Sequence, residues 1–135
     1  MPILLPRDMP LTPYDPSQAP TPEEWLALDE QLRIQRAEDY HRAVGVEVPN
    51  LKAHAVLHAI VENQIAEGFA AVGRAMDRLI GEGLSRHEAI HAIASVLAEH
   101  LHELFNAKAG ENKTAASYGA AVDKLTARRW LGHGR

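Results

Sequence analysis

Hydrophobic positions recur at spacings of three and four between residues 22 and 106, which is the periodicity of one face of an α-helix. The pattern predicts helices over residues 22–42, 51–67, 70–80 and 86–106. We find no stretch that alternates between apolar and polar residues as a half-buried strand does, and no internal repeat. The sequence therefore predicts an all-α fold, an irregular helical bundle of four main helices plus a short C-terminal helix.

Capping residues support the predicted helix boundaries. Thr21 and Glu24 have the spacing of a capping box, with Pro22 at the first helical position. Ser85 and Glu88 form a second capping box, and Asn50 is a further N-cap candidate. The breaks between helices coincide with glycine or proline, at Gly45, Pro49, Gly68, Gly81 and Gly83.

Prolines crowd the N-terminus, where seven of the eight fall within the first 22 residues. Proline fixes φ and lacks an N–H group, so residues 1–21 are expected to form an extended arm instead of a helix or central strand. The arm carries several large apolar residues, Ile3, Leu4, Leu5, Leu11 and Tyr14. We therefore expect it to lie against the body of the protein or against a neighbouring subunit, with disorder as the alternative.

The helical core domain is predicted to end at residue 106, and residues 107–135 are predicted to form a basic tail with a short helix over residues 114–129. The tail has six basic and two acidic residues, a net charge of +4 in a chain whose net charge is -4. The remainder of the chain therefore carries -8. Together with the apolar arm, this asymmetry favours docking between copies, and we expect a homo-oligomer, most simply a dimer.

Composition narrows the classes of function. A chain of 135 residues with 46% hydrophobic and 24% charged residues is expected to fold around one core. The absence of cysteine excludes disulfides and thiolate metal sites, so a metal would bind to nitrogen and oxygen. The net charge gives no electrostatic reason to expect nucleic-acid or membrane binding. The chain shows no signal peptide and no run of 18 apolar residues, so a cytoplasmic location is expected.

The eight histidines are the unusual feature of the composition. His54, His58 and Glu62 follow one another at a spacing of four, so they share one face of the helix predicted over residues 51–67. Apolar residues flank this face, which indicates that it points into the core. His87 and His91 occupy an alanine-rich face of the helix predicted over residues 86–106.

If the three helices from residue 51 to residue 106 run up, down and up, the four imidazoles meet at one level. We predict that His54, His58, His87 and His91 bind one divalent metal ion, with Glu62 as a ligand or as a group that orients a ligand. Zinc is the first candidate, with iron, manganese or nickel as alternatives.

His87, Glu88 and His91 also match the H-E-x-x-H pattern of zinc peptidases, in which the glutamate activates a metal-bound water. Glu88 is thus a candidate catalytic residue for hydrolysis, although the capping box with Ser85 gives it a competing structural role. The alternative function is a non-enzymatic interaction or oligomerisation module whose core histidines form hydrogen bonds. Three other polar residues, His41, Glu99 and His102, are expected at the surface.

The stretch from His54 to His102 resembles domain of unknown function 1841, a family of small helical bacterial proteins. The matching segments are His54-x-x-x-His58-x-x-x-Glu62-Asn63-Gln64, His87-Glu88-Ala89-Ile90-His91 and Val96-Leu97-Ala98-Glu99. The resemblance covers about 50 of the 135 residues. It implies that His58, Glu62, His87 and His91 are the positions of interest, and it implies no activity and no substrate.

Overall fold

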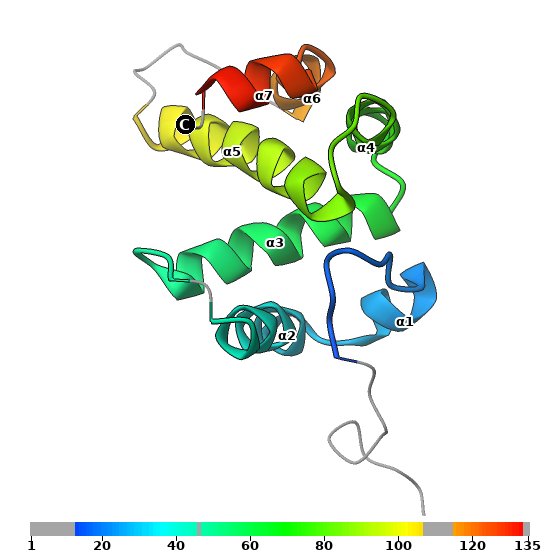
Figure 1. The fold of residues 1–135 in the computed structure, drawn as a ribbon, viewed down its shortest axis with the longest axis vertical. Helices are drawn as coiled ribbons and strands as arrows, with labels where there is room; N and C mark the ends of the chain where they lie inside the picture. The colour runs from blue at the N-terminus through cyan, green and yellow to red at the C-terminus, as the bar shows by residue number, and fades with distance from the viewer. Residues whose placement is uncertain (1–12, 46, 107–114, 134–135) are drawn as a thin grey trace, which may run out of the picture.

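A computed structural model describes residues 13–45, 47–106 and 115–133, and these residues form helices and no strand (Figure 1). The all-α fold is therefore confirmed. The helices are α1 (Pro22–Ala27), α2 (Glu30–Ala43), α3 (Leu51–Ala66), α4 (Ala70–Gly81), α5 (Arg86–Phe105), α6 (Ala115–Asp123) and α7 (Ala127–His133). Four apolar residues of the predicted arm, Ile3, Leu4, Leu5 and Leu11, and residues 107–114 of the predicted tail lie outside the described residues.

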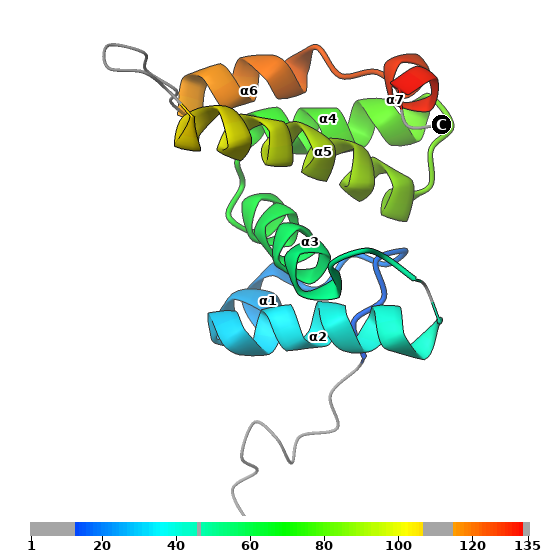
Figure 2. The same cartoon turned by 90° about the vertical axis from the view of Figure 1, so that its left-hand side faces the viewer.

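The helices stack in layers on the two sides of α3. Figure 2 shows α1 and α2 on one side of α3, α4 and α5 on the other, and α6 and α7 beyond them. The same view looks nearly along α3, whereas α5 lies across it. The up, down and up arrangement, on which the meeting of the four imidazoles at one level was made conditional, is therefore not found. Because α3 and α5 cross, only a short part of each helix lies near the other.

Residues 22–42 do not form the single helix that their periodicity predicts. Leu28 is extended, with φ -76° and ψ 145°, and Asp29 begins α2 by accepting a hydrogen bond from the backbone N–H of Leu32 at 2.9 Å. Aspartate is more favourable at an N-cap than inside a helix, because its carboxylate competes for backbone N–H groups. Arg33 then donates to the carbonyls of Leu26 and Leu28, both at 2.9 Å, so the break leaves these two groups paired.

The described part of the helix predicted over residues 114–129 also forms two helices, α6 and α7. The carbonyls of Val122 and Leu125 accept hydrogen bonds from Arg78 of α4 at 2.9 Å each, which stabilises the end of α6. Thr126 then begins α7, where its hydroxyl accepts from the backbone N–H of Arg129 at 3.1 Å. Tyr118 is buried in the same core as α3, α4 and α5, so α6 and α7 pack as part of that core.

Two of the three predicted caps are confirmed. The Asn50 side chain accepts from the N–H of Ala53 at 3.0 Å, and Ser85 accepts from the N–H of Glu88 at 3.1 Å. Thr21 is the N-cap residue of α1 and Pro22 is its first residue, as predicted, but the Thr21 side chain makes no capping hydrogen bond, so the predicted capping box is wrong. Gly68 and Gly83 have φ values of 78° and 106°, which are unfavourable for residues with a side chain, and they allow the chain to turn before and after α4.

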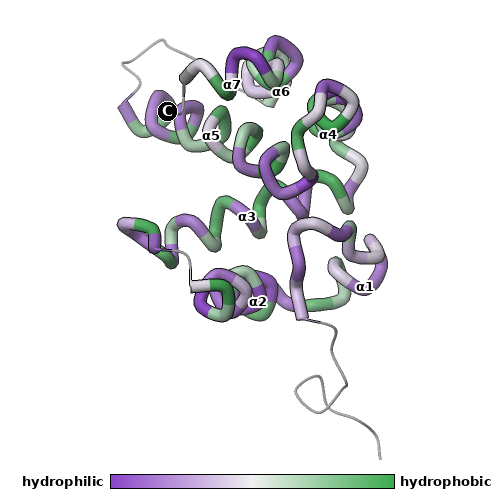
Figure 3. The backbone as a smooth tube through the Cα atoms, in the orientation of Figure 1, coloured by the Kyte–Doolittle hydropathy of each residue, from purple (hydrophilic) through white to green (hydrophobic). Residues whose placement is uncertain are grey.

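α3 lies between two hydrophobic clusters. The larger cluster joins α3 to α4, α5, α6 and α7, and the smaller one joins it to α1, α2 and Tyr14. Figure 3 shows hydrophilic and hydrophobic stretches alternating along α3. The helix therefore carries hydrophilic residues although other helices lie on both of its sides. His58 and Glu62, each 1% exposed, lie on this helix, so polar groups are buried where the two clusters meet. Among the described residues, no helix has both the length and the apolar character needed to cross a bilayer.

Candidate metal centre

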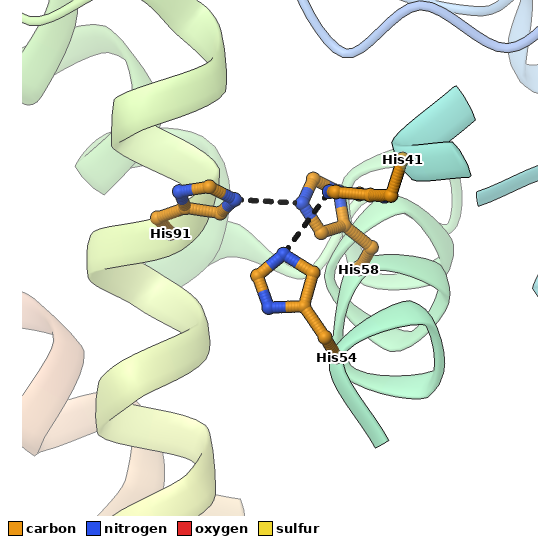
Figure 4. Close-up of side chains that lie close together, drawn as sticks. All are labelled: His41, His54, His58 and His91. Carbon is orange, nitrogen blue, oxygen red and sulfur yellow. Dashed lines mark hydrogen bonds between the residues drawn. The ribbon is translucent and has the colours of Figure 1, made fainter. Parts of the chain in front are cut away.

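Three helices bring four histidines together at the junction of the two hydrophobic clusters. His41 comes from the last turn of α2, His54 and His58 from α3, and His91 from α5 (Figure 4). One ring nitrogen from each lies within 4.8 Å of those of the other three. These four residues are called the histidine cluster below. They can hold a metal ion.

The Nε2 atoms are the ones that approach one another. The Nε2 atoms of His58 and His91 lie 2.9 Å apart, and those of His54 and His41 lie 3.0 Å apart. The ring centroids of His54 and His91 are 4.9 Å apart, so the two pairs adjoin. The rings therefore converge on a shared volume, as the sequence predicted for His54, His58 and His91.

His41 was expected at the surface, and this expectation is wrong because the side chain is fully buried. The signal was present in the sequence. Ile34, Ala37 and His41 are spaced as i, i+3 and i+7, which places His41 on the buried face of α2. Glu99 and His102 are exposed, as expected.

His87 lies beside the histidine cluster and is not one of the four. Its ring centroid is 4.2 Å from that of His91 and 5.2 Å from that of His58. The Nε2 atom of His87 is buried and has no hydrogen-bond partner among the described residues. His91, one turn further along α5, is the residue of that helix whose Nε2 reaches α3.

The Glu62 carboxylate is occupied by other partners. Arg86 donates to both of its oxygens at 2.8 Å, and the Tyr14 hydroxyl donates to Oε2 at 2.6 Å. The backbone carbonyl of Pro16 accepts a further hydrogen bond from Arg86 at 3.0 Å. This bidentate ion pair neutralises a charge that would otherwise be buried alone. Glu62 therefore acts on the cluster through Tyr14 and not as a member of it.

The hydrogen bonds determine which nitrogen of His58 carries the proton. Tyr14 has one hydroxyl proton and donates it to Glu62, so its oxygen must accept at the 3.1 Å contact with His58 Nδ1. His58 is thus protonated on Nδ1, and the lone pair of its Nε2 faces the cluster. Burial, followed by the negative charge of Glu62, raises the pKa of Tyr14 well above its usual value, which keeps the hydroxyl protonated.

His41 is oriented in the same way. Its Nδ1 lies 2.7 Å from the carbonyl oxygen of Ala37, which can only accept, so Nδ1 carries the proton. The Nε2 of His41 therefore also carries a lone pair directed at the cluster, where it accepts the hydrogen bond from His54 Nε2 at 3.0 Å. Outer hydrogen bonds of this kind are typical of histidines that bind metals, because they determine both the tautomer and the ring orientation.

The surroundings of His54, His58, His87 and His91 favour the neutral form of their rings. Burial, followed by repulsion from neighbouring histidines, lowers the pKa of His54 to about 4 and that of His91 to about 3. The same two causes, in the same order, lower the pKa of His58 further and that of His87 as well. A neutral ring offers a lone pair at neutral pH, which a metal ligand requires.

Glu88, the candidate catalytic residue, lies in the first turn of α5, where its backbone N–H is bound by Ser85. Its carboxylate is not part of the histidine cluster. It lies close enough to His87 for its charge to raise the pKa of that ring against the larger lowering effect of burial.

One side of the histidine cluster opens into a hollow with a volume of about 250 Å³. The hollow is lined by His54, His58 and His91, by Ala94 and Ala98 of α5, and by Leu57, Ser95 and Trp130. Ala94 and Ala98, on the alanine-rich face of α5, border this opening. A ligand can therefore approach the cluster between α3, α5 and α7.

Comparison with protein-family models, with curated proteins and with solved structures finds no match for this chain. The resemblance to domain of unknown function 1841 stays a prediction.

Proposed function

We propose that this protein binds one divalent metal ion through His41, His54, His58 and His91. The observation that carries the proposal is the convergence of four ring nitrogens within 4.8 Å of one another. The tautomers of His41 and His58 support it, since both rings direct a lone pair at the shared volume. The proposed ligand set keeps three of the histidines first predicted, replaces His87 by His41, and gives Glu62 an orienting role.

The spacing of the nitrogens supports zinc as the first candidate. Zinc with four imidazoles is tetrahedral, and Zn–N bonds near 2.0–2.1 Å place the nitrogens about 3.3 Å apart. The two hydrogen-bonded pairs, at 2.9 and 3.0 Å, would open slightly to reach that value, and the remaining pairs, which lie within 4.8 Å, would close toward it. Iron and nickel also accept imidazole, whereas manganese prefers oxygen ligands and is the weakest of the predicted alternatives.

Hydrolysis has less support than binding. Four protein ligands fill the tetrahedral positions of zinc, as in structural sites, whereas catalytic zinc sites leave one position for water. The Glu88 carboxylate lies outside the histidine cluster, so its proposed role as a base has no geometric support beyond its closeness to His87.

The alternative function, an interaction module with structural histidines, is favoured by one observation. Each member of the histidine cluster already has a hydrogen-bonding partner within it, His58 with His91 and His41 with His54. Such pairs can hold α2, α3 and α5 in register without a metal. On this interpretation the predicted dimer would be the functional unit.

Metal content of the protein distinguishes the two functions. The protein is expressed without an affinity tag, and its metal content is measured by elemental mass spectrometry. Metal binding is then measured by calorimetric titration with zinc, iron, nickel and manganese. We expect one zinc per chain, and loss of that zinc in His58→Ala and in His91→Ala. His102→Ala is the matched control, since His102 is exposed on the same helix as His91. A protein that takes up no metal in either measurement would favour the structural role.

A further inference from the structure

A second hollow adjoins the one that opens onto the histidine cluster. It has a volume of about 670 Å³ and lies between α5, α6 and α7. Ser95 and Trp130 line both hollows, so the two meet at these side chains. The volume of the larger one falls within the range of small-molecule sites, about 300–1,000 Å³.

One face of α5 runs along this whole surface. His91 and Ser95 are one turn apart, and Glu99, which lines the larger hollow, follows after one more turn. The distance along the helix from His91 to Glu99 is about 12 Å, from the rise of 1.5 Å per residue. The two hollows thus form a groove in which a small organic molecule can reach the histidine cluster.

The groove offers an apolar surface and basic side chains. Val96, Leu125 and Trp130 supply apolar surface, and the flat indole suits an aromatic or extended apolar group. Lys124 and Arg129 line the same hollow and are exposed. In Figure 2 α6 runs back along α5, so the residues that follow α6 lie toward the beginning of α5, where His91 is.

The proposed metal adds positive charge at that same end. An imidazole binds a metal as a neutral ligand, so the four proposed ligands add no negative charge, and the nearby carboxylate of Glu62 is already neutralised by Arg86. The full charge of a divalent ion would therefore remain in the smaller hollow, which adjoins the hollow that Lys124 and Arg129 line. The acidic residues of the groove lie further along α5, with Glu99 two turns and Glu103 three turns beyond His91.

We propose that this groove binds an organic anion, a carboxylate or phosphate group on an apolar body. The anionic group lies between the metal and the side chains of Lys124 and Arg129, and the apolar body lies on Trp130. This inference rests on the proposed metal binding, because the metal supplies part of the positive charge.

Calorimetric titration with matched probes tests the proposal. The zinc-loaded protein is titrated in a buffer free of phosphate and carboxylate with 3-phenylpropionate, phenyl phosphate and the neutral 3-phenylpropanol. We expect at least one anion to bind about tenfold more tightly than the alcohol, a difference of about 1.4 kcal/mol. The anion that binds more tightly shows whether the natural ligand carries a carboxylate or a phosphate group.

Substitutions locate the site. Lys124→Gln and Arg129→Gln should each lower the affinity for the preferred anion about fivefold, and removal of the zinc should lower that affinity about tenfold. Arg128→Gln is the matched control, because Arg128 is exposed beside Arg129 and does not line the groove. All three substitutions should leave the zinc content unchanged.

The outcomes separate the two proposals. Equal affinity for anion and alcohol, or equal effects of Arg128→Gln and Arg129→Gln, would overturn the groove proposal while the measured zinc content upholds metal binding. A chain that binds no zinc would overturn both.

Discussion

At the residue scale, Tyr14 links a buried carboxylate to a candidate metal ligand. It donates to Glu62 at 2.6 Å and accepts from His58 at 3.1 Å, so the charge of Glu62 is felt at His58 through one hydroxyl. Its ring also packs against that of Trp25, with centroids 5.5 Å apart. Tyr14 therefore positions His58 without touching the proposed metal.

Replacing Tyr14 by phenylalanine should weaken zinc binding about tenfold, the lower end of the effect of removing an outer partner of a metal-bound histidine. The ring packing is kept, and only the hydroxyl that selects the His58 tautomer is lost. The affinity is measured by calorimetric competition with a chelator. Tyr118→Phe is the control, because it removes a hydroxyl that donates to Gln64 at 2.7 Å, away from the histidine cluster. Equal zinc affinity in the two variants would contradict the role of Tyr14.

Glu62→Gln should destabilise the protein by about 3 kcal/mol, because it leaves the charge of Arg86 buried without a carboxylate. The side chains of this pair are 1% and 12% exposed. The free energy of unfolding is measured by urea denaturation of the metal-free protein. Asp123→Asn, which removes an ion pair with Arg74 whose side chains are 40% and 58% exposed, should cost less than about 1 kcal/mol. A Glu62→Gln cost as small as that of the control would show that Arg86 does not depend on this partner.

At the scale of the helices, the break between α1 and α2 determines where His41 lies. α2 begins at Asp29, and the face of α2 that carries Ile34 and Ala37 packs against α3. His41 follows on that face and so reaches the histidine cluster. A continuous helix over residues 22–42 would lack the change of direction that the extended Leu28 allows.

Asp29→Ala should destabilise the protein by about 1 kcal/mol through loss of the N-cap. The loss in the free energy of unfolding is measured by urea denaturation, as a shift of the midpoint with no change in the dependence of that free energy on urea concentration. Asp39→Ala, an exposed substitution inside α2, serves as the control and should change stability by less than about 0.5 kcal/mol. Similar costs for both substitutions would mean that the cap does not set the start of α2.

At the scale of the whole molecule, the histidine cluster joins the two hydrophobic clusters. His41 belongs to the side of α1 and α2, His91 belongs to the side of α4 to α7, and α3 supplies the other two rings. Protonation of these rings would therefore place charge where the two halves of the fold meet. Metal binding would join the same halves.

The metal-free protein should lose stability as the pH falls from about 6.5 toward about 4. Unfolded histidines become protonated near pH 6.5, whereas the lowered pKa values of His54 and His91, about 4 and about 3, keep these rings neutral in the fold. The unfolded chain then binds more protons, so acid favours unfolding. Carboxylates with lowered pKa values, such as Glu38 and Asp123, contribute only at lower pH.

Melting temperatures of the metal-free protein at pH 7.5 and pH 5.5 measure this effect. His91→Gln removes one of the rings and should make the pH dependence shallower, whereas His102→Gln, on an exposed part of α5, should leave it unchanged. A melting temperature that does not fall between the two pH values would contradict the assignment of neutral buried rings.

Much of the local structure follows from the sequence because it depends on neighbours a few residues apart. The periodicity and the caps at Asn50 and Ser85 place α3, α4 and α5 to within about two residues of their observed ends. The spacing of His54 and His58 places both rings on one face for the same reason. The breaks at Asp29 and Thr126 were missed, since a single capping residue competes there with an otherwise helical pattern.

The sequence by itself determined the all-α class, the main helices and two residues of one helix that face the histidine cluster, because these depend on the geometry of a single helix. Only the tertiary structure decided that His41 belongs to the histidine cluster while His87 lies beside it, and that Tyr14 connects Glu62 to His58. Those relations depend on how α3 crosses α2 and α5. They also depend on the contacts of Tyr14 with His58 and with Glu62, which lie 44 and 48 positions further along the chain. No local pattern encodes such contacts, because they exist only once the separate helices have packed.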